Sequence, residues 1–198
     1  MKRRNFLIAS SAATFSGFTK SSANTLPWSE QYQHGEVVQI NIDGMLPGQQ
    51  ILLKIGNGPI AVRYRTEEEI TRARETDVWE LRDINARNAN LQENALATDD
   101  NRTIDKDGKW LVYRPVCTHL GAITLDSSKP FSDSDPYWIN CPSHGGRYDS
   151  AGRVRAGPPR ENLPIPLAKF IQQNILEIHS YRSRGLEKLI REAHPSTW

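Results

Sequence analysis

Two short stretches of the sequence each combine a cysteine with a histidine, and both kinds of side chain bind metal ions. One residue separates Cys117 from His119, and two residues separate Cys141 from His144. These are the only two cysteines in the chain. Thiolate and imidazole ligands suit zinc or iron–sulfur chemistry and not the hard cations that prefer oxygen. The sequence therefore predicts a metal centre whose four ligands come from two loops.

The division of the ligands between the loops distinguishes two kinds of metal centre. Zinc sites usually take two cysteines or two histidines from one stretch of chain. Here each loop offers one thiolate and one imidazole. This arrangement suits a two-iron cluster in which one iron binds both sulfurs and the other binds both nitrogens. A zinc ion that only holds the two loops together is the alternative.

The residues around the ligands resemble the two ligand boxes of the Rieske iron–sulfur proteins. Leu120-Gly121, Gly145 and Tyr148-Asp149 match those boxes, and Gly157-Pro158 matches the start of the family's proline loop. Three segments outside the boxes look like the Rieske subunit of proteobacterial ubiquinol–cytochrome c reductase: PIAVRYRTEEEI (59–70), NARNAN (85–90) and NLPIPLAKF (162–170). The resemblance covers roughly residues 35–178 and implies a Rieske-type [2Fe-2S] cluster.

The resemblance also implies a role for each residue of the predicted centre. Cys117 and Cys141 would hold the inner iron, and His119 and His144 the outer iron, which accepts and releases one electron. In the family, one histidine accepts a hydrogen bond from quinol, so His144 and His119 are also the candidate catalytic residues. Three further residues are expected at the cluster: Leu120, Pro158 and Tyr148, the last of which donates to the first cysteine's sulfur in the family.

Three departures from the family pattern imply a changed environment for the cluster. Quinol-oxidising members have a disulfide between the loops, but Ala122 and Ser143 stand at its two positions. Gly146 replaces a serine that donates a hydrogen bond to a bridging sulfide, and Arg160 adds a charge to the proline loop. Such groups around the ligands tune a metal centre. We therefore expect a lowered potential, which Gly146→Ser should raise and Tyr148→Phe should lower further.

Length and composition favour one domain with appendages. The chain has 198 residues, of which 37% are hydrophobic and 24% charged, and its net charge is +2. A chain of this length can bury a sizeable core. Because neither charge is in excess, no nucleic-acid partner is indicated.

Residues 1–25 are typical of a targeting segment. Arg3 and Arg4 directly precede an apolar run, as in twin-arginine export signals; the basic region of a general signal peptide is the alternative. The apolar run, 6–18, has 13 residues, whereas a bilayer needs about 20. Small residues at 21–23 indicate a cleavage site. The chain is therefore expected at the periplasmic side of the bacterial inner membrane through a signal-anchor, or in the soluble periplasm if the signal is cleaved.

The pattern of apolar residues predicts strands over much of the chain after the signal. Val38, Ile40 and Ile42 alternate with polar neighbours, which is typical of a half-buried strand. Further strands are predicted at 51–55, 60–64, 110–113, 137–140, 147–154 (a hairpin) and 174–178.

One short helix and one long excursion interrupt these strands. Thr66 and Glu69 form a capping-box pattern, so a helix is expected from there to about Glu75. Residues 80–108 are polar and rich in Asn and Asp, which predicts a long excursion over the surface. The acidic stretch 99–101 within it is expected to be solvated.

Together these elements indicate an all-β protein. We expect a Rieske-type antiparallel β-sandwich base with a small inserted cluster-binding β subdomain and one short helix. This Rieske domain should span residues 26–180, with the subdomain at about 110–160 and the ligand loops at its tip. Residues 181–198 should form a C-terminal tail with a docked or frayed helix; a helix that binds a partner is the alternative.

Two functions follow from the resemblance. The first is the electron-transfer subunit of quinol–cytochrome c reductase in a respiratory chain, with quinol and the cytochrome b and cytochrome c subunits as partners. The similar segments outside the ligand boxes favour it. The second is a soluble periplasmic Rieske carrier derived from that subunit, of lowered potential and with another redox partner. The short apolar run and the missing disulfide favour this alternative.

Overall fold

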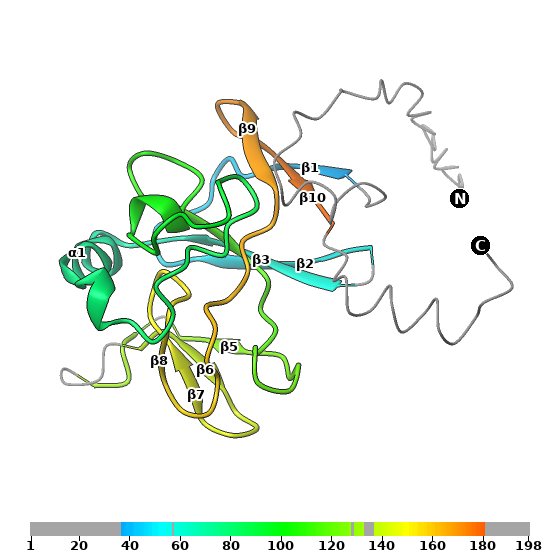
Figure 1. The fold of residues 1–198 in the computed structure, drawn as a ribbon. Helices are drawn as coiled ribbons and strands as arrows, with labels where there is room; N and C mark the ends of the chain where they lie inside the picture. Colours follow the sequence, from blue (N-terminus) through cyan, green and yellow to red (C-terminus); the bar gives the residue numbers. More distant parts are fainter. Residues whose placement is uncertain (1–36, 57, 128, 133–136, 181–198) are drawn as a thin grey trace, which may run out of the picture.

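The computed structural model describes residues 37–56, 58–127, 129–132 and 137–180, which form three antiparallel sheets and one α-helix (Figure 1). The predicted export signal and C-terminal tail lie outside the described residues. Within the described ranges, no helix is long and apolar enough to cross a membrane.

Two three-stranded sheets form the base of the molecule. In spatial order their strands are β1 (Val37–Asn41), β10 (Ile175–His179) and β9 (Ala168–Gln172) in the first, and β2 (Gln50–Ile55), β3 (Gly58–Tyr64) and β4 (Trp110–Tyr113) in the second. Between them lies a buried apolar core, in which Ile60 and Val62 of β3 belong to one cluster with Leu176 and Ile178 of β10. This arrangement is the predicted sandwich base.

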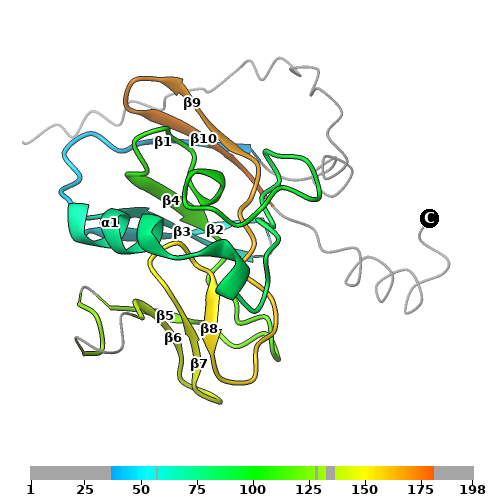
Figure 2. The ribbon, with the colours of Figure 1, turned by 60° about the vertical axis from the view of Figure 1, so that its left-hand side comes forward.

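A third sheet carries the cysteine–histidine loops and packs on the other face of the second sheet. Its strands, in spatial order, are β5 (Leu125–Asp126), β6 (Ile139–Cys141), β7 (Gly146–Tyr148) and β8 (Val154–Ala156). Successive side chains of a strand point to opposite faces, so Leu111 and Tyr113 of β4 join the core of this third sheet while Val112 joins the base core. Figure 2 shows the resulting three layers, with β2, β3 and β4 in the middle. The strand at 110–113, expected at the start of the cluster-binding subdomain, thus pairs with β3 in the middle layer.

The helix α1 (Glu67–Glu75) begins where the sequence predicts it. The Glu69 backbone N–H donates to the Thr66 hydroxyl at 3.3 Å, and the Thr66 N–H donates to the Glu69 carboxylate at 2.8 Å. These two reciprocal bonds satisfy donors that the first turn of a helix leaves free. Ile70 and Ala73 are the buried apolar residues of the helix.

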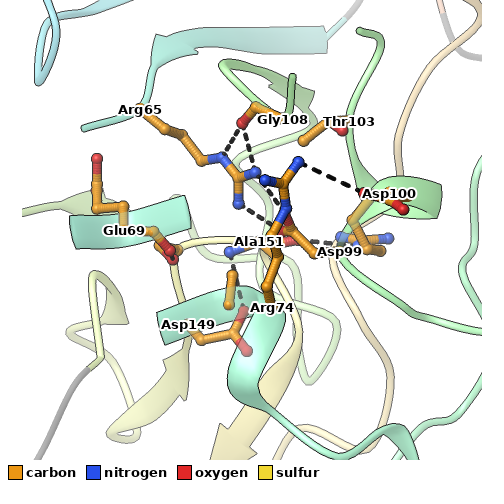
Figure 3. A network of polar contacts seen from close by, with 12 residues as sticks. Arg65, Glu69, Arg74, Asp99, Asp100, Thr103, Gly108, Asp149 and Ala151 are labelled. Atoms are coloured by element: carbon orange, nitrogen blue, oxygen red, sulfur yellow. Dashed lines mark hydrogen bonds and ion pairs between the residues drawn. The ribbon is translucent and has the colours of Figure 1, made fainter. Parts of the chain in front are cut away.

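The segment 80–108 is more buried than its polar sequence indicates, so the prediction of a solvated excursion is wrong in part. Asp99, expected in solvent, is only 4% exposed. Figure 3 shows the cause: Arg65 donates to both oxygens of Asp99, at 2.7 and 2.9 Å, and to the Gly108 carbonyl. The pairing of a buried cation with a buried anion draws this stretch inward. The short helices η2 (Val78–Glu80) and η3 (Asp100–Arg102) lie near its two ends.

A second buried arginine links this segment to the ligand-bearing part of the chain. Arg102 is fully buried and donates to four backbone carbonyls, those of Ala86, Ala151, Gly152 and Leu163. Burial lowers the pKa of its guanidinium to about 9, which leaves it charged at neutral pH. Arg102 therefore joins three stretches that are remote in sequence.

Asp149 also lies in this buried network, and its charge should make stability depend on pH. Its carboxylate accepts from the N–H groups of Ala151 and Arg153 at 2.9 and 3.0 Å, and from the Arg153 side chain at 2.7 Å. Burial alone would raise the pKa of this carboxyl. The charge of Arg153 and these donors outweigh that effect and hold the pKa below its ordinary value of 3.8. A depressed folded-state pKa means that the ionised carboxylate stabilises the fold above pH 3.8, and that this contribution is lost as pH falls through the folded pKa.

We therefore expect Asp149→Asn to lower the free energy of unfolding by about 2 kcal/mol at pH 7, since a hydrogen bond to a charged group is lost. The deficit should shrink as the pH falls below 3.8, where the unfolded wild-type carboxyl is also protonated. Urea unfolding between pH 7 and pH 3 measures it. Asp107→Asn, at a carboxyl that is 69% exposed, is the control and should stay within about 0.5 kcal/mol at every pH. If Asp149→Asn lowered the free energy of unfolding by the same amount at pH 7 and at pH 3, the ionised Asp149 carboxylate would not be the source of the effect.

Candidate metal centre

The two ligand loops are closed in the same way. The Gly121 N–H donates to the Cys117 carbonyl at 2.9 Å, and the Gly145 N–H donates to the Cys141 carbonyl at 3.0 Å. Both glycines have positive φ, +78° and +68°, a conformation in which glycine carries no steric cost. Each loop therefore turns tightly after its cysteine, and both begin from paired segments, since a bridge between Val116 and Ile123 brackets the first and the β6–β7 hairpin brackets the second.

The structure brings the four predicted ligands together, with the two cysteines buried and the two histidines at the surface. Cys117 and Cys141 are free cysteines, 3% and 1% exposed, and their thiols lie within hydrogen-bonding reach of each other. His119 and His144 are exposed, with ring centroids 5.0 Å apart and planes at 89°. Sulfur ligands thus lie together inside and nitrogen ligands together outside.

This sorting fits a two-iron cluster. Such a cluster needs two thiolates on one iron and two imidazoles on the other, and the side chains form those two pairs. A single zinc ion would need all four donor atoms about 2.0–2.3 Å from one point. Among the described residues, no group of three or more Cys, His, Asp or Glu side chains is placed to hold one ion.

The two thiols differ in their environments. Burial raises the pKa of the Cys117 thiol and outweighs the hydrogen bond from Tyr148. Burial acts in the same direction on Cys141, but the Cys117 thiol and the N–H groups of Ser143 and His144 outweigh it and lower the pKa of the Cys141 thiol. The Cys141 thiol thus accepts backbone hydrogen bonds that favour its thiolate, the form that binds metal.

Tyr148 and Thr118 connect the second ligand loop to the first. The Tyr148 hydroxyl donates to the Cys117 sulfur at 3.4 Å and accepts from the Thr118 N–H at 3.2 Å. Burial raises the pKa of Tyr148, so its hydroxyl keeps its proton. The Thr118 hydroxyl donates to the Glu161 carbonyl at 2.7 Å. Sequence reasoning singled out Tyr148 but treated Thr118 only as a spacer between two ligands, and no local pattern marks the contact with Glu161.

The remaining predicted residues lie at the surface of this centre. Leu120 follows His119 and is 72% exposed, and Pro158 is exposed as well. The buried proline of that loop is its neighbour, Pro159, whose ring carbon Cγ lies 2.6 Å from the position that a Cβ on Gly146 would take. The expectation that Gly146→Ser alone restores a hydroxyl to the cluster therefore does not fit this backbone, because Pro159 fills that space.

The chain is similar to proteins of known type. The model of the Rieske [2Fe-2S] domain family matches residues 74–171. The ubiquinol-cytochrome c reductase iron-sulfur subunit of Cereibacter sphaeroides is 41% identical over 182 residues, which cover 89% of this chain and 94% of that protein. The subunit of the same name from Rhodobacter capsulatus is 37% identical over 188 residues, with the same coverage of 89% and 94%. Among solved structures, a hyperthermophilic respiratory Complex III chain gives a TM-score of 0.40 at 22% identity, covering 70% of this chain and 71% of that one.

Proposed function

The chain belongs to the Rieske iron–sulfur subunits of ubiquinol–cytochrome c reductase, and from this premise we propose that it passes electrons from quinol to a c-type cytochrome. We further propose that Cys117, Cys141, His119 and His144 hold the [2Fe-2S] cluster that its Rieske domain implies. The observation that carries this proposal is the sorting of the ligands, with buried sulfurs and exposed imidazoles.

A bound [2Fe-2S] cluster with two neutral imidazole ligands accepts and releases one electron at a higher potential than an all-cysteine cluster. The protein keeps Cys117 and Cys141 away from water, so the thiolate side is shielded from proton exchange and from oxidants. The exposed rings of His119 and His144 are the part of the centre that a quinol can reach. With one nitrogen of each ring bound to iron, the other would first have to lose its own proton; it could then accept a hydrogen bond from the quinol hydroxyl and take its proton.

Partners and location belong to the same proposal. The relatives named above are subunits of a ubiquinol–cytochrome c reductase, so we assign cytochrome b and cytochrome c subunits as partners. The exposed Leu120 beside His119 offers an apolar contact for such a partner. With residues 1–25 as export signal or signal-anchor, 26–180 as the Rieske domain and 181–198 as a tail, the centre would work at the periplasmic side of the inner membrane.

One observation favours a soluble carrier as the second candidate. Ala122 is half-buried against the core of the third sheet and Ser143 is exposed, so the ligand loops have no disulfide between them. Hydrogen bonds between Tyr148 and two residues of the first ligand loop, Cys117 and Thr118, connect the loops instead. The two loops are thus connected differently from those of family members with the disulfide, and such a difference beside the cluster is consistent with a different redox partner.

A tagged full-length chain purified from its own organism tests the function. We expect it in the membrane fraction, with b- and c-type haem and with ubiquinol-dependent reduction of cytochrome c. Tyr148→Phe should keep the iron but lower the midpoint potential, because the hydroxyl stabilises the more negative, reduced state. If about 1 kcal/mol of that hydrogen bond differs between redox states, the midpoint falls by roughly 40 mV, and the rate should fall with it.

Tyr113→Phe is the matched control, since its buried hydroxyl bonds to Gln50 at 3.0 Å and not to a ligand. It should leave the midpoint unchanged. Recovery of haem-free, cluster-containing protein from the periplasm alone would favour the soluble carrier. An equal midpoint in Tyr148→Phe and wild type would remove the role assigned to Tyr148.

A further inference from the structure

The absence of a side chain at residue 146 has a steric cause. Gly146 is buried and pairs with Cys141 across the β6–β7 hairpin. Its backbone does not adopt the positive φ that favours glycine. A Cβ built there would lie 2.6 Å from Cγ and 3.0 Å from Cδ of Pro159, and 3.3 Å from the Cβ of Cys141. Contacts of 2.6 Å do not occur between carbon atoms in folded proteins, so the Pro159 ring occupies the space of a side chain at residue 146.

Pro159 cannot easily move away, because its loop is anchored on both sides. Before it, the Gly157 backbone packs on the second ligand loop so closely that a Cβ there would lie 2.8 Å from the Cα of Gly146. The Gly157 carbonyl also accepts a hydrogen bond from Arg82. After it, the Glu161 carbonyl accepts from Thr118.

The Glu161 side chain adds a further anchor, since its carboxylate pairs with Arg87 at 3.2 Å. Arg87 in turn donates to Asp83 at 2.8 Å, and Asp83 accepts from the Asn162 N–H at 2.9 Å. The loop that carries Pro159 is thus fixed to the segment 80–108 as well as to both ligand loops. A side chain introduced at residue 146 would therefore have to displace the Pro159 loop together with the hydrogen bonds and the ion pair that hold it.

We propose that Gly146 and Pro159 act as one unit, in which Pro159 is a positioning residue that fills the side-chain site of residue 146 beside Cys141. An apolar ring there excludes both water and a hydroxyl donor from that side of the thiolate. Without a donor, the reduced and more negative state of the centre loses stabilisation, so the unit lowers the midpoint potential. The steric part of this proposal stands on the contact between residue 146 and the Pro159 ring, whereas the effect on potential rests on the proposed function.

A double-mutant cycle on the full-length chain tests both parts: Gly146→Ser, Pro159→Ala and the two combined. Thermal unfolding followed by circular dichroism is the first measurement. Gly146→Ser alone should lower the midpoint temperature by about 5 °C or more, as overpacking does. Adding Pro159→Ala should recover at least half of that loss, because the new side chain then has room. Pro158→Ala combined with Gly146→Ser is the control, since it removes an exposed proline of the same loop and should recover nothing.

The second measurement is voltammetry of the same variants at one pH. The combined Gly146→Ser/Pro159→Ala variant should shift the reduced-to-oxidised ratio at a fixed potential about fivefold toward the reduced state, which is a rise of roughly 40 mV. Gly146→Ser alone should give no such rise. If the changes in unfolding temperature of Gly146→Ser and Pro159→Ala simply added in the combined variant, the two residues would not act as one unit. A combined variant with full iron content and an unchanged or lower midpoint would overturn its effect on potential. Wild-type protein without a [2Fe-2S] cluster would defeat the proposed function instead, and the unfolding measurements would still decide the steric part.

Discussion

Cys141→Ala and His119→Ala should each abolish the cluster, so that iron falls from about two atoms per chain to near zero. Each removes one ligand of a pair, and the chain has no third cysteine to replace Cys141. Iron and acid-labile sulfide assays measure the loss directly. The rhombic paramagnetic resonance spectrum of the reduced wild type should disappear in both variants.

His179→Ala is the matched control for the histidine. His179 lies on β10 in the first sheet, where its ring contacts Glu177 at 3.3 Å. Its replacement should leave iron, sulfide and spectrum unchanged. Wild-type protein that holds stoichiometric zinc and no iron, although expressed with ample iron, would show that the loops form a zinc site. Full iron content in Cys141→Ala would show that the ligand assignment is wrong.

Arg102→Met should cause a large loss of stability, although Arg102 lies outside the metal centre. The substitution keeps an apolar side chain of similar length but leaves four carbonyls without their buried donor. Each unsatisfied buried group costs about 1–3 kcal/mol, and with partial relaxation we expect a total of about 4 kcal/mol. Urea unfolding of the full chain measures the difference.

Arg72→Met provides the comparison on helix α1. Arg72 is 33% exposed and pairs with Glu68 one turn away at 3.1 Å. A pair of this kind contributes about 0.5 kcal/mol or less, and the guanidinium also lies 5.8 Å from the centre of the Trp138 ring, a contact of about 0.5–1 kcal/mol. The control should therefore lose at most about 1.5 kcal/mol. A comparable loss in both variants would mean that Arg102 acts through general charge and not through its four carbonyl partners.

The parts of the fold that depend on short-range pattern were predictable from sequence. The capping box at Thr66 and Glu69 sets the start of α1, and both of its hydrogen bonds are present. The alternation in 38–42 predicts a strand, and β1 begins one residue earlier. The cysteine–histidine spacing predicts two ligand loops, and the structure places both thiols together and both rings together.

The buried arginines were not predictable in the same way. Charged residues are almost never fully buried unless paired, so a polar stretch such as 80–108 indicates a surface position. A guanidinium, however, has five donors, and the partners of Arg65 and Arg102 lie 16 to 61 residues away. Because no local pattern encodes such partners, the sequence does not show which arginine turns inward.

The contact between Gly146 and Pro159 escaped sequence reasoning for a related reason. A glycine at that position looks like a missing serine when the ligand boxes are compared one residue at a time. Its meaning depends on the shape of the residue opposite, 13 positions later in the chain. Packing between two loops is a property of the assembled structure, and it changes what a single substitution would do.

The hydrogen bonds of Arg102 also constrain the order in which the chain can fold. Three of its four carbonyls, those of Ala151, Gly152 and Leu163, follow it by 49 to 61 residues. Contacts at such separation form slowly, since a long loop must first close. During synthesis, the stretch that bears Cys117 and Cys141 is therefore complete before Arg102 has the last three of its partners. The hydrogen bonds that join the segment 80–108 to residues 151–163 can thus form only after both ligand loops have been made.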